Sequence, residues 1–427
     1  MARFIGIKND KIYIISDKVF DNELYKILEV PAELDGVSAP ELISNYRIRD
    51  NKIIPKHAKL PASQLKVDFV GNWKMRCGIA TYSENLVPEV FKHVGDYKLF
   101  IEENDNPTGL LNMMGDDLIP DNKINICWKR GESLQKLASE IKNYNPDVIW
   151  LQHEFGIFPN ARYWLSLMNQ LSGYRVIVTM HSVFRHKDKI ICEAAMPEIV
   201  VHLDGAKKIL KEEKQLASKV YVIPHGCFPC DNKSKLWNFY KTERTFMQFG
   251  FGFRYKGWEL SIKAVSILKE KYPDIFFTGL FSESEFNKME HEVYYNELMD
   301  EIVALGLQDN VAILRGYQSE ETLDAYLRTN RATVFPYISH PQHEVFGASG
   351  AARIAMSKGI PVITTGVNHF SDLPTIKADT PEEIAAQLEI LFLDPKARSA
   401  QVEKQCAYLD ENTWEKIGLQ YVKIFES

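Results

Sequence analysis

Short runs of apolar residues alternate along most of this chain with longer segments whose apolar positions recur every three or four residues. The runs predict buried β-strands, and the longer segments predict amphipathic helices. In the first half, strands are expected at residues 65–70, 97–101, 123–127, 148–152, 175–180, 198–203 and 219–223. Helices between most of these strands make this half a series of βαβ units, which is typical of a parallel sheet.

The same pattern starts again after residues 231–241, a polar stretch rich in Asn, Lys and Ser that suits a hinge. Further strands are expected at 246–250, 275–280, 311–314, 332–336 and 361–364. We therefore expect two Rossmann-like, doubly wound α/β domains, residues 61–235 and 236–407, that face each other across a cleft. The last segment, residues 408–427, has the apolar stripe of a helix and could pack back on the first domain.

Residues 1–60 follow a different pattern. Short alternating segments at 4–7, 11–15, 46–49 and 52–55 are separated by Asn-Asp, Asp-Gly and Asp-Asn turns. This spacing predicts a small β-rich N-terminal module. The module has no cluster of catalytic residue types, and two roles stay open for it: contact between copies of the chain in a homo-oligomer, or placement of an acceptor.

The composition is that of an ordinary soluble globular protein, with 427 residues of which 45% are apolar and 25% are charged. The formal net charge of −6 argues against a nucleic acid backbone or an anionic membrane as the main partner. No apolar run approaches the roughly 20 residues that span a bilayer. The first residues also lack the apolar core of a signal peptide, so we expect a cytoplasmic protein.

Six cysteines are scattered along the chain, and only Cys227 and Cys230 lie close together. A redox pair or a zinc-binding pair is one interpretation, but no second pair or histidine cluster follows at the spacing of metal ligands. We therefore expect two reduced thiols in a loop after a strand, and no metal site.

Candidate chemistry is concentrated where the second series of strands begins. An apolar strand runs into a glycine turn that carries Arg254 and Lys256, and a second glycine-containing segment, from Glu344 to Gly350, precedes a helix. A strand, a glycine turn and a helix N-terminus favour an anion, because free backbone N–H groups and the helix dipole both face it. The two cations would add the full charges that a diphosphate demands.

Polar residues also follow the predicted strands of the first domain. Gly78 lies in a long loop before a helix, which again presents N–H groups to an anion, although an ordinary βα turn would look the same. His153 and Glu154 are candidates for acceptor binding or proton handling, and a capped turn is the alternative interpretation. His181 and His225 follow two further strands and are also candidates on the acceptor side.

Together these features resemble the retaining, nucleotide-sugar-dependent glycosyltransferases of family 4, which have the GT-B architecture. The resemblance runs from about residue 65 to the C-terminus and does not explain the first 60 residues. It rests on the segments Arg76-Cys-Gly-Ile-Ala-Thr-Tyr, Gln152-His-Glu-Phe-Gly-Ile-Phe, Thr179-Met-His-Ser, Val222-Ile-Pro-His-Gly, Lys256-Gly and Gly359-Ile-Pro-Val-Ile-Thr. Each segment is loose by itself, and their order and spacing across two domains carry the match.

The resemblance implies roles for individual residues. Arg254 and Lys256 would hold the donor diphosphate and stabilise the leaving group, and Glu344 would contact the transferred sugar. His153 is a further catalytic candidate. The residues expected to approach the sugar and the phosphates are Gly78, Gly252, Phe346, Gly347, Ser349 and Gly350. No cofactor is needed beyond the nucleotide sugar, which is a co-substrate, and cations with a helix dipole would replace a metal ion.

One departure concerns the ribose of the donor. The family's second glutamate, expected eight residues after Glu344, falls on Ala352, and neither Arg353 nor Ile354 supplies a carboxylate. A subset of similar enzymes has Ser-Gly near this point, which Ser349-Gly350 matches. How the ribose would be held therefore stays open.

Two other functions are compatible with the same fold. A nucleotide-sugar epimerase would need residues such as His225 and Glu344 to handle a proton on the sugar. A non-catalytic nucleotide-sugar-binding protein would explain the missing second glutamate. The donor base, the sugar and the acceptor are not readable from the sequence, and the acceptor could be a glycan, a lipid-linked sugar, a small molecule, a protein or a modified nucleic acid base.

Overall fold

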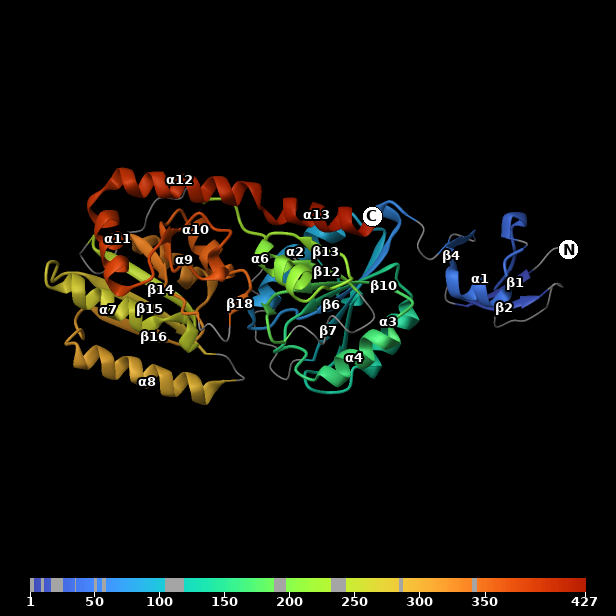
Figure 1. The fold of residues 1–427 in the computed structure, drawn as a ribbon, viewed down its shortest axis with the longest axis horizontal. Helices are drawn as coiled ribbons and strands as arrows, with labels where there is room; N and C mark the ends of the chain where they lie inside the picture. The colour runs from blue at the N-terminus through green and yellow to red at the C-terminus, as the bar shows by residue number, and fades with distance from the viewer. Residues whose placement is uncertain are drawn as a thin grey trace.

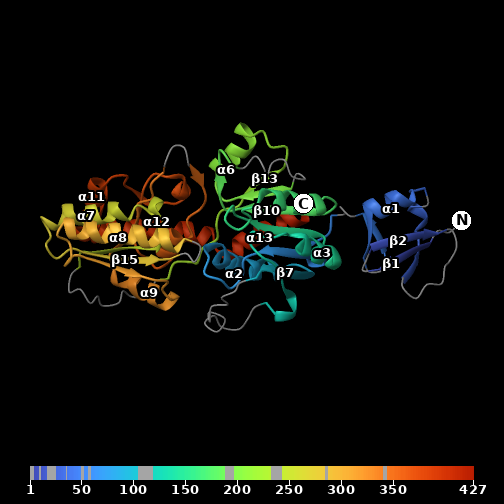
Figure 2. The same cartoon turned by 90° about the horizontal axis from the view of Figure 1, so that it is seen from below.

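The computed structural model describes residues 4–8, 11–16, 26–34, 36–49, 52–55, 59–103, 119–187, 197–231, 243–283, 287–339 and 344–427. They form three bodies in a row, with a small N-terminal module at one end and two α/β domains beyond it (Figures 1 and 2). The expected boundary between the α/β domains, at residues 235 and 236, lies outside the described residues, as does most of the expected hinge.

The first α/β domain is built on a seven-stranded parallel sheet in the order β13-β12-β10-β9-β6-β7-β8. Its strands are β6 (Lys66–Gly71), β7 (Asp96–Glu102), β8 (Ile124–Trp128), β9 (Val148–His153), β10 (Arg175–Met180), β12 (Glu198–Val201) and β13 (Val220–Val222). The helices are α2 (Gly78–Phe91), α3 (Gln135–Tyr144), α4 (Ala161–Gln170) and α6 (Asp204–Lys208), the last followed by a π-helical turn, η5 (Ile209–Glu213). The central strands read as continuous apolar runs because helices cover both faces of the sheet.

The second α/β domain has a six-stranded parallel sheet in the order β16-β15-β14-β17-β19-β20. Its strands are β14 (Thr245–Phe251), β15 (Phe276–Ser282), β16 (Val311–Arg315), β17 (Ala332–Phe335), β19 (Val362–Thr364) and β20 (Ile376–Lys377). The helices are η6 (Arg254–Lys256), α7 (Trp258–Lys269), α8 (Lys288–Ala304), α9 (Glu320–Thr329), α10 (Gly350–Ser357), η8 (Asn368–Phe370), α11 (Pro381–Leu393) and α12 (Pro395–Glu411). The fold class predicted from the sequence, two doubly wound domains and a β-rich module, is confirmed.

The chain passes between the α/β domains twice, and the two passages touch. The first follows β13, and the second links α12 to α13 (Trp414–Glu426). The backbone N–H of Cys227 donates to the carbonyl of Asn412 at 3.0 Å, and the N–H of Trp414 donates to the carbonyl of Cys227 at 3.2 Å. Helix α13 then packs on the first domain, where the hydroxyl oxygens of Tyr421 and Tyr82 lie 3.0 Å apart.

The expectation of two reduced thiols is wrong for one of the pair. Cys230 forms a disulfide with Cys406 of α12, whereas Cys227 is a buried free cysteine. The two bonded residues are 176 positions apart in the sequence, and they meet because α12 returns to the passage that follows β13. Such pairing depends on tertiary structure and cannot be deduced from cysteine spacing.

The N-terminal module contains a three-stranded antiparallel sheet and a hairpin. The sheet has the order β2-β1-β3, from β1 (Phe4–Lys8), β2 (Lys11–Ser16) and β3 (Lys26–Glu29). Helix α1 (Ala39–Asn45) precedes the hairpin of β4 (Tyr46–Arg49) and β5 (Lys52–Pro55). A small core of its own, including Ile5, Leu42 and Ile48, holds the module together.

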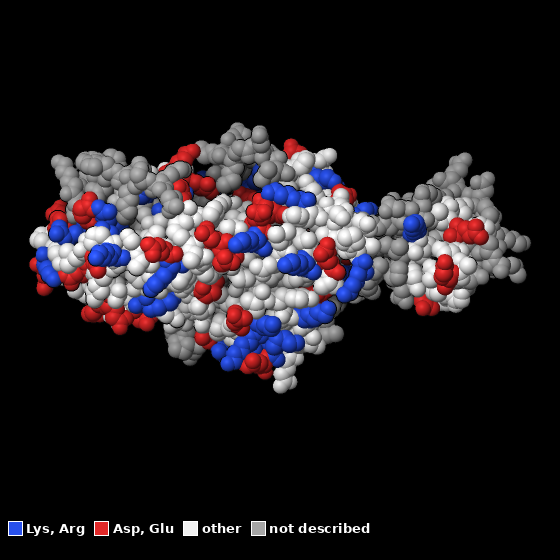
Figure 3. Space-filling model, turned by 90° about the horizontal axis from the view of Figure 1, so that it is seen from above, with Lys and Arg blue, Asp and Glu red and all other residues white. Residues whose placement is uncertain are grey.

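The surface carries both signs of charge. Acidic and basic side chains are interspersed over the face of the α/β domains shown in Figure 3, with one gathering of basic side chains on the first domain. In the part of the chain that the structure describes, there is no helix of the length and apolar character that a membrane crossing requires.

Candidate functional site

A cavity of about 450 Å³ lies between the two α/β domains, within the usual range for small-molecule sites. The first domain contributes residues that follow its strands, such as Glu154 after β9 and His181 after β10. The second domain contributes the ends of β14 and β15, with Phe251 and Ser282. Ligands of doubly wound sheets bind at the carboxyl ends of the strands, and here both sheets direct those ends at one cavity.

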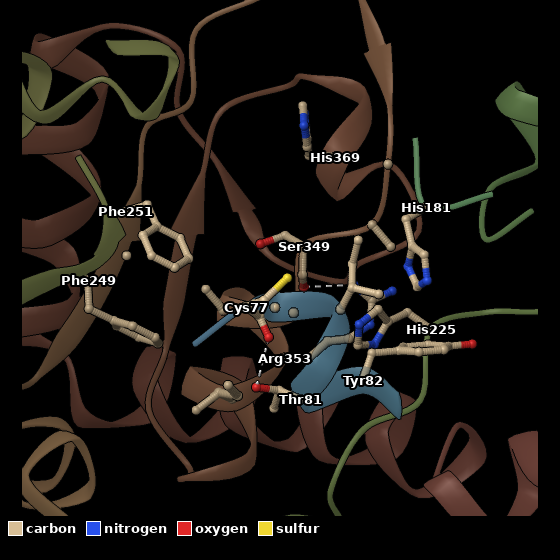
Figure 4. Close-up of a pocket in the computed structure, with 18 of the residues that line it drawn as sticks. Cys77, Thr81, Tyr82, His181, His225, Phe249, Phe251, Ser349, Arg353 and His369 are labelled. Atoms are coloured by element: carbon tan, nitrogen blue, oxygen red, sulfur yellow. Dashed lines mark hydrogen bonds between the residues drawn. The ribbon is translucent and has the colours of Figure 1, made fainter. Parts of the chain in front are cut away.

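Two helix N-termini reach this cavity from opposite domains. Helix α2 begins at Gly78 after Cys77, whose side chain does not cap it, and Cys77, Gly78 and Ile79 line the cavity. Helix α10 begins at Gly350 after Ser349, and these two residues also line the cavity (Figure 4). A helix N-terminus carries free N–H groups and a partial positive charge. The cavity is therefore suited to an anion.

Lys256 adds a full charge to the same cavity. Its ammonium group donates to the hydroxyl of Tyr337 at 2.6 Å and lies 3.8 Å from the centre of the Tyr337 ring. Burial opposes the charge, but the contacts with Tyr255 and Tyr337 outweigh it and raise the pKa of Lys256. Gly257, which follows it, has φ of +63° and lies against the carbonyl of Pro336, so a side chain would clash there. This turn fixes the place of Lys256.

Arg254, which was predicted to hold a diphosphate together with Lys256, does not line the cavity with it. Its guanidinium pairs with the carboxylate of Glu297 on α8, at 2.6 and 2.8 Å, and lies over the ring of Tyr294. Arg254 is exposed and does not line the cavity. The acidic helix α8, which only the fold brings beside η6, holds the arginine there.

Three other predicted residues are also outside the cavity wall. Glu344 lies between the domains, where Arg185 donates to one carboxylate oxygen at 2.9 Å and Asn368 donates to the other at 2.7 Å. Phe346 is buried with the core of the first domain. Gly252 is a packing position, because a Cβ there would lie 1.9 Å from the ring of Phe281. In contrast, three residues that were predicted to bind the donor line the cavity: Gly347, Ser349 and Gly350.

His153, predicted from the sequence to be catalytic, is not among the residues that line the cavity. His153 is 2% exposed and packs among the rings of Phe155, Phe158 and Trp164 in the first-domain core. Its neighbour Glu154 does line the cavity. Burial raises the pKa of Glu154, opposed by hydrogen bonds from Ser182 and from the N–H of Phe155. His153 is the last residue of β9 and faces the core, whereas Glu154 follows the strand and reaches the cavity.

The two remaining acceptor-side candidates, His181 and His225, come together around Tyr82 (Figure 4). The ring centres of Tyr82 and His181 are 4.8 Å apart, and those of Tyr82 and His225 are 4.9 Å apart. Burial lowers the pKa of both histidines well below the ordinary value. Both imidazoles are therefore neutral at pH 7. The single N–H of His181 donates to the side-chain oxygen of Gln152 at 2.8 Å and that of His225 donates to the carbonyl of Gly226 at 2.6 Å, so each ring has one nitrogen left to accept a hydrogen bond.

Buried histidines should make the first domain sensitive to acid. Burial lowers the pKa of His153 to about 3 and that of His202 to about 4. Because the unfolded chain binds these protons at about pH 6.5 and the folded chain does not, stability is lost as pH falls below that value. Each histidine should cost about 1.4 kcal/mol of unfolding free energy between pH 7.5 and 5.5.

Urea unfolding at these two pH values measures this loss. The variant His153→Phe keeps a ring among its aromatic neighbours and removes one titrating group. We expect its pH-dependent loss to be smaller than that of the unchanged protein by about 1.4 kcal/mol. An identical pH dependence in both proteins would show that the pKa of His153 is the same in the folded and the unfolded chain.

Arg353 and His369 are among the cavity residues that were not singled out from the sequence as site residues. Arg353 of α10 is 2% exposed, and it donates to the carbonyl of Ser349 at 3.0 Å and pairs with Asp372. His369 stacks on Tyr255 with ring centres 6.0 Å apart, and burial lowers its pKa to about 3. An arginine inside the otherwise apolar segment 350–356 was a signal that could have identified Arg353.

The aromatic residues divide between wall and core. Tyr255 and Tyr337 line the cavity, whereas Trp258 is completely buried in the core of the second domain and Phe346 is buried in the core of the first. Across the described ranges, no group of three or more His, Cys, Asp or Glu side chains is arranged to hold a metal ion. Trp414 of α13 also lines the cavity, so the C-terminal helix takes part in the site.

Comparison with known proteins found a family model for part of the chain and solved structures with a similar fold. Residues 231–405 match the family model of glycosyl transferases group 1, whereas no curated protein sequence matches the chain. A solved glycosyltransferase of Rickettsia africae superposes with a TM-score of 0.62 at 14% identity, covering 85% of this chain and 98% of that one.

Two further solved structures cover a similar share of this chain. HepE of Anabaena, solved with UDP, has a TM-score of 0.61 at 13% identity, covering 84% of this chain and 99% of its own. An E. coli trehalose-6-phosphate protein bound to UDP-2-fluoro glucose has a TM-score of 0.65 at 11% identity, covering 85% of this chain and 99% of its own. The two α/β domains of this protein therefore have the GT-B fold, and its second domain matches the model of glycosyl transferases group 1.

Proposed function

We propose that this protein is a retaining glycosyltransferase that moves a hexose from a nucleoside-diphosphate sugar to an acceptor without the help of a metal ion. The observation that carries the proposal is the convergence of Lys256 and the N-termini of α2 and α10 on one cavity. The match to glycosyl transferases group 1 supports it. So do the GT-B structures that contain UDP or a UDP sugar.

The cavity residues are arranged to stabilise a leaving diphosphate. As the glycosidic bond breaks, negative charge grows on the leaving phosphate oxygen, and a fixed cation with aligned N–H groups lowers the energy of that state. Lys256 would supply the cation, and the N-terminus of α10, which begins at Gly350, would supply the N–H groups. The acceptor would then attack from the same face as the leaving phosphate, which takes up its proton, so no protein nucleophile is required.

The first domain would bind the acceptor. Glu154, His181 and His225 line its side of the cavity, and the two neutral imidazoles can hydrogen-bond to hydroxyl groups. The alternative, an epimerase, would need His225 and Glu344 near the same sugar carbon. His225 lines the cavity, but Glu344 is outside its wall and bound to Arg185, so the geometry favours transfer.

The first test is thermal unfolding with UDP, GDP, ADP and dTDP and their common sugars. A ligand at about 100 times its dissociation constant adds about 2.7 kcal/mol to the unfolding free energy. We expect one nucleotide family to raise the melting temperature, and transfer to an acceptor panel to persist in EDTA. No shift with any nucleotide would overturn the proposal. Binding without turnover would favour a non-catalytic protein, and conversion of the donor alone would favour an epimerase.

A further inference from the structure

The two α/β domains are joined beside the cavity by a short antiparallel strand pair. Strand β11 (Val183–Phe184) of the first domain pairs with β18 (Val345–Phe346) of the second. His181 and Ser182 of the cavity wall directly precede β11, and Gly347 of the opposite wall directly follows β18. We call β11, β18 and the flanking pair Arg185 and Glu344 the interdomain clasp.

The side chain of Phe346 is seated in the other domain. It is 8% exposed and, among the residues that the structure describes, it is the single second-domain member of the first-domain core cluster. Its ring packs on the backbone of Gly205 in α6, where an added Cβ would lie 2.8 and 2.9 Å from two ring carbons. A glycine at this position therefore leaves the space that the ring occupies.

A charged contact closes the clasp at its outer end. Arg185 donates to Glu344 at 2.9 Å and also pairs with Glu213 of η5. The second oxygen of Glu344 accepts from Asn368 of η8, which precedes the cavity residue His369. Arg185 of the first domain therefore binds the carboxylate of Glu344, which belongs to the second domain.

The clasp also sets the two cavity walls in contact. A Cβ on Gly347 would lie 2.7 Å from the carbonyl oxygen of His181, so the backbones of the two domains meet there. The residues after Gly347 form the turn at the N-terminus of α10. The position of this turn relative to the first domain therefore depends on β18.

We propose that Arg185, Gly205 and Phe346 are positioning residues that hold the Gly347–Gly350 turn against the first domain and so complete the donor site. None of the three touches the cavity in the described residues. The inference rests on the proposed function, because it assumes that the Gly347–Gly350 turn binds the diphosphate of the donor. Opening the clasp should reduce the fraction of molecules that can bind donor, and apparent affinity falls by that fraction.

Gly205→Ala is the sharpest variant. Gly205 lies within helix α6 and has no positive φ, so alanine should favour the helix itself. The methyl group of the alanine would displace the ring of Phe346 from its position against α6. We expect nucleotide affinity to fall about 10-fold, which is about 1.4 kcal/mol, with the donor KM raised and kcat changed little. Gly173→Ala, where an added Cβ meets nothing within 4 Å, is the matched control and should bind as the unchanged protein does.

Further substitutions distinguish a positioning role of these residues from a general loss of structure. Phe346→Leu should relieve the conflict, so the double variant with Gly205→Ala should bind better than Gly205→Ala alone. Arg185→Met should weaken binding while Arg185→Lys, which keeps the charge, should recover part of it. Melting temperatures without ligand check that each variant is folded.

The experiment uses the full chain and titrations with UDP, GDP, ADP and dTDP. If the unchanged protein binds none of them, the proposed function fails and the clasp has no donor site to complete. If the unchanged protein binds one of them and Gly205→Ala and Arg185→Met bind it equally well, the clasp proposal is overturned while the proposed function stands. Weaker binding in both variants with rescue by the second substitutions supports the clasp.

Discussion

Replacing Lys256 with alanine should lower sugar transfer by about 10²- to 10³-fold, the usual cost of removing one preorganised group that stabilises a transition state. The loss should appear mainly in kcat, because Lys256 is expected to act on charge that grows as the bond to the leaving diphosphate breaks. Its ammonium group is held by Tyr337 in the cavity at 2.6 Å. Steady-state kinetics with saturating donor would measure the effect.

Arg254→Ala is the matched control, since it removes a cation two residues away in the same 3₁₀ turn. Because Arg254 is exposed and paired with Glu297, we expect donor turnover within about threefold of the unchanged protein, as for a surface substitution away from a site. An equal loss in both variants would show that the donor draws Arg254 away from Glu297. Full activity of Lys256→Ala would remove Lys256 from the mechanism.

Replacing Arg353 with methionine should destabilise the second domain by about 3–5 kcal/mol, the usual cost of breaking a buried ion pair. Arg353 is 2% exposed at its side chain and its partner Asp372 is 22% exposed. The substitution would leave Asp372 without its cation, and the carbonyl of Ser349 without the 3.0 Å hydrogen bond from the guanidinium. Thermal unfolding should show a lower midpoint for the second domain.

Two further variants test the physical reason for this loss. Tyr408→Phe removes a hydroxyl that contacts both Arg353 and Asp372, at 3.0 and 2.8 Å, and should cost about 1 kcal/mol. Adding Asp372→Asn to Arg353→Met should recover part of the loss, because it removes the unpaired charge. If the double variant were less stable than Arg353→Met alone, an unpaired Asp372 would not be the cause.

The sequence motifs did not predict which of two neighbouring side chains faces the cavity, because that depends on the local backbone geometry. Arg254 and Lys256 share one 3₁₀ turn, in which residues two apart point roughly 120° from each other. His153 ends strand β9 facing the core, while Glu154 faces the cavity. Phe346 and Gly347 are divided in the same way between the other domain and the cavity wall.

The sequence by itself determined the two doubly wound domains, because strands covered on both faces must be continuous apolar runs and amphipathic helices must recur between them. It also placed the glycine turns and Ser349-Gly350, since close backbone approach and a helix start require those residue types locally. Tertiary structure alone decided three contacts: the disulfide between Cys230 and Cys406, the packing of Phe346 on Gly205, and the ion pair of Arg254 with Glu297. Each of these contacts joins residues far apart in the chain, and their partners are fixed only when the elements pack.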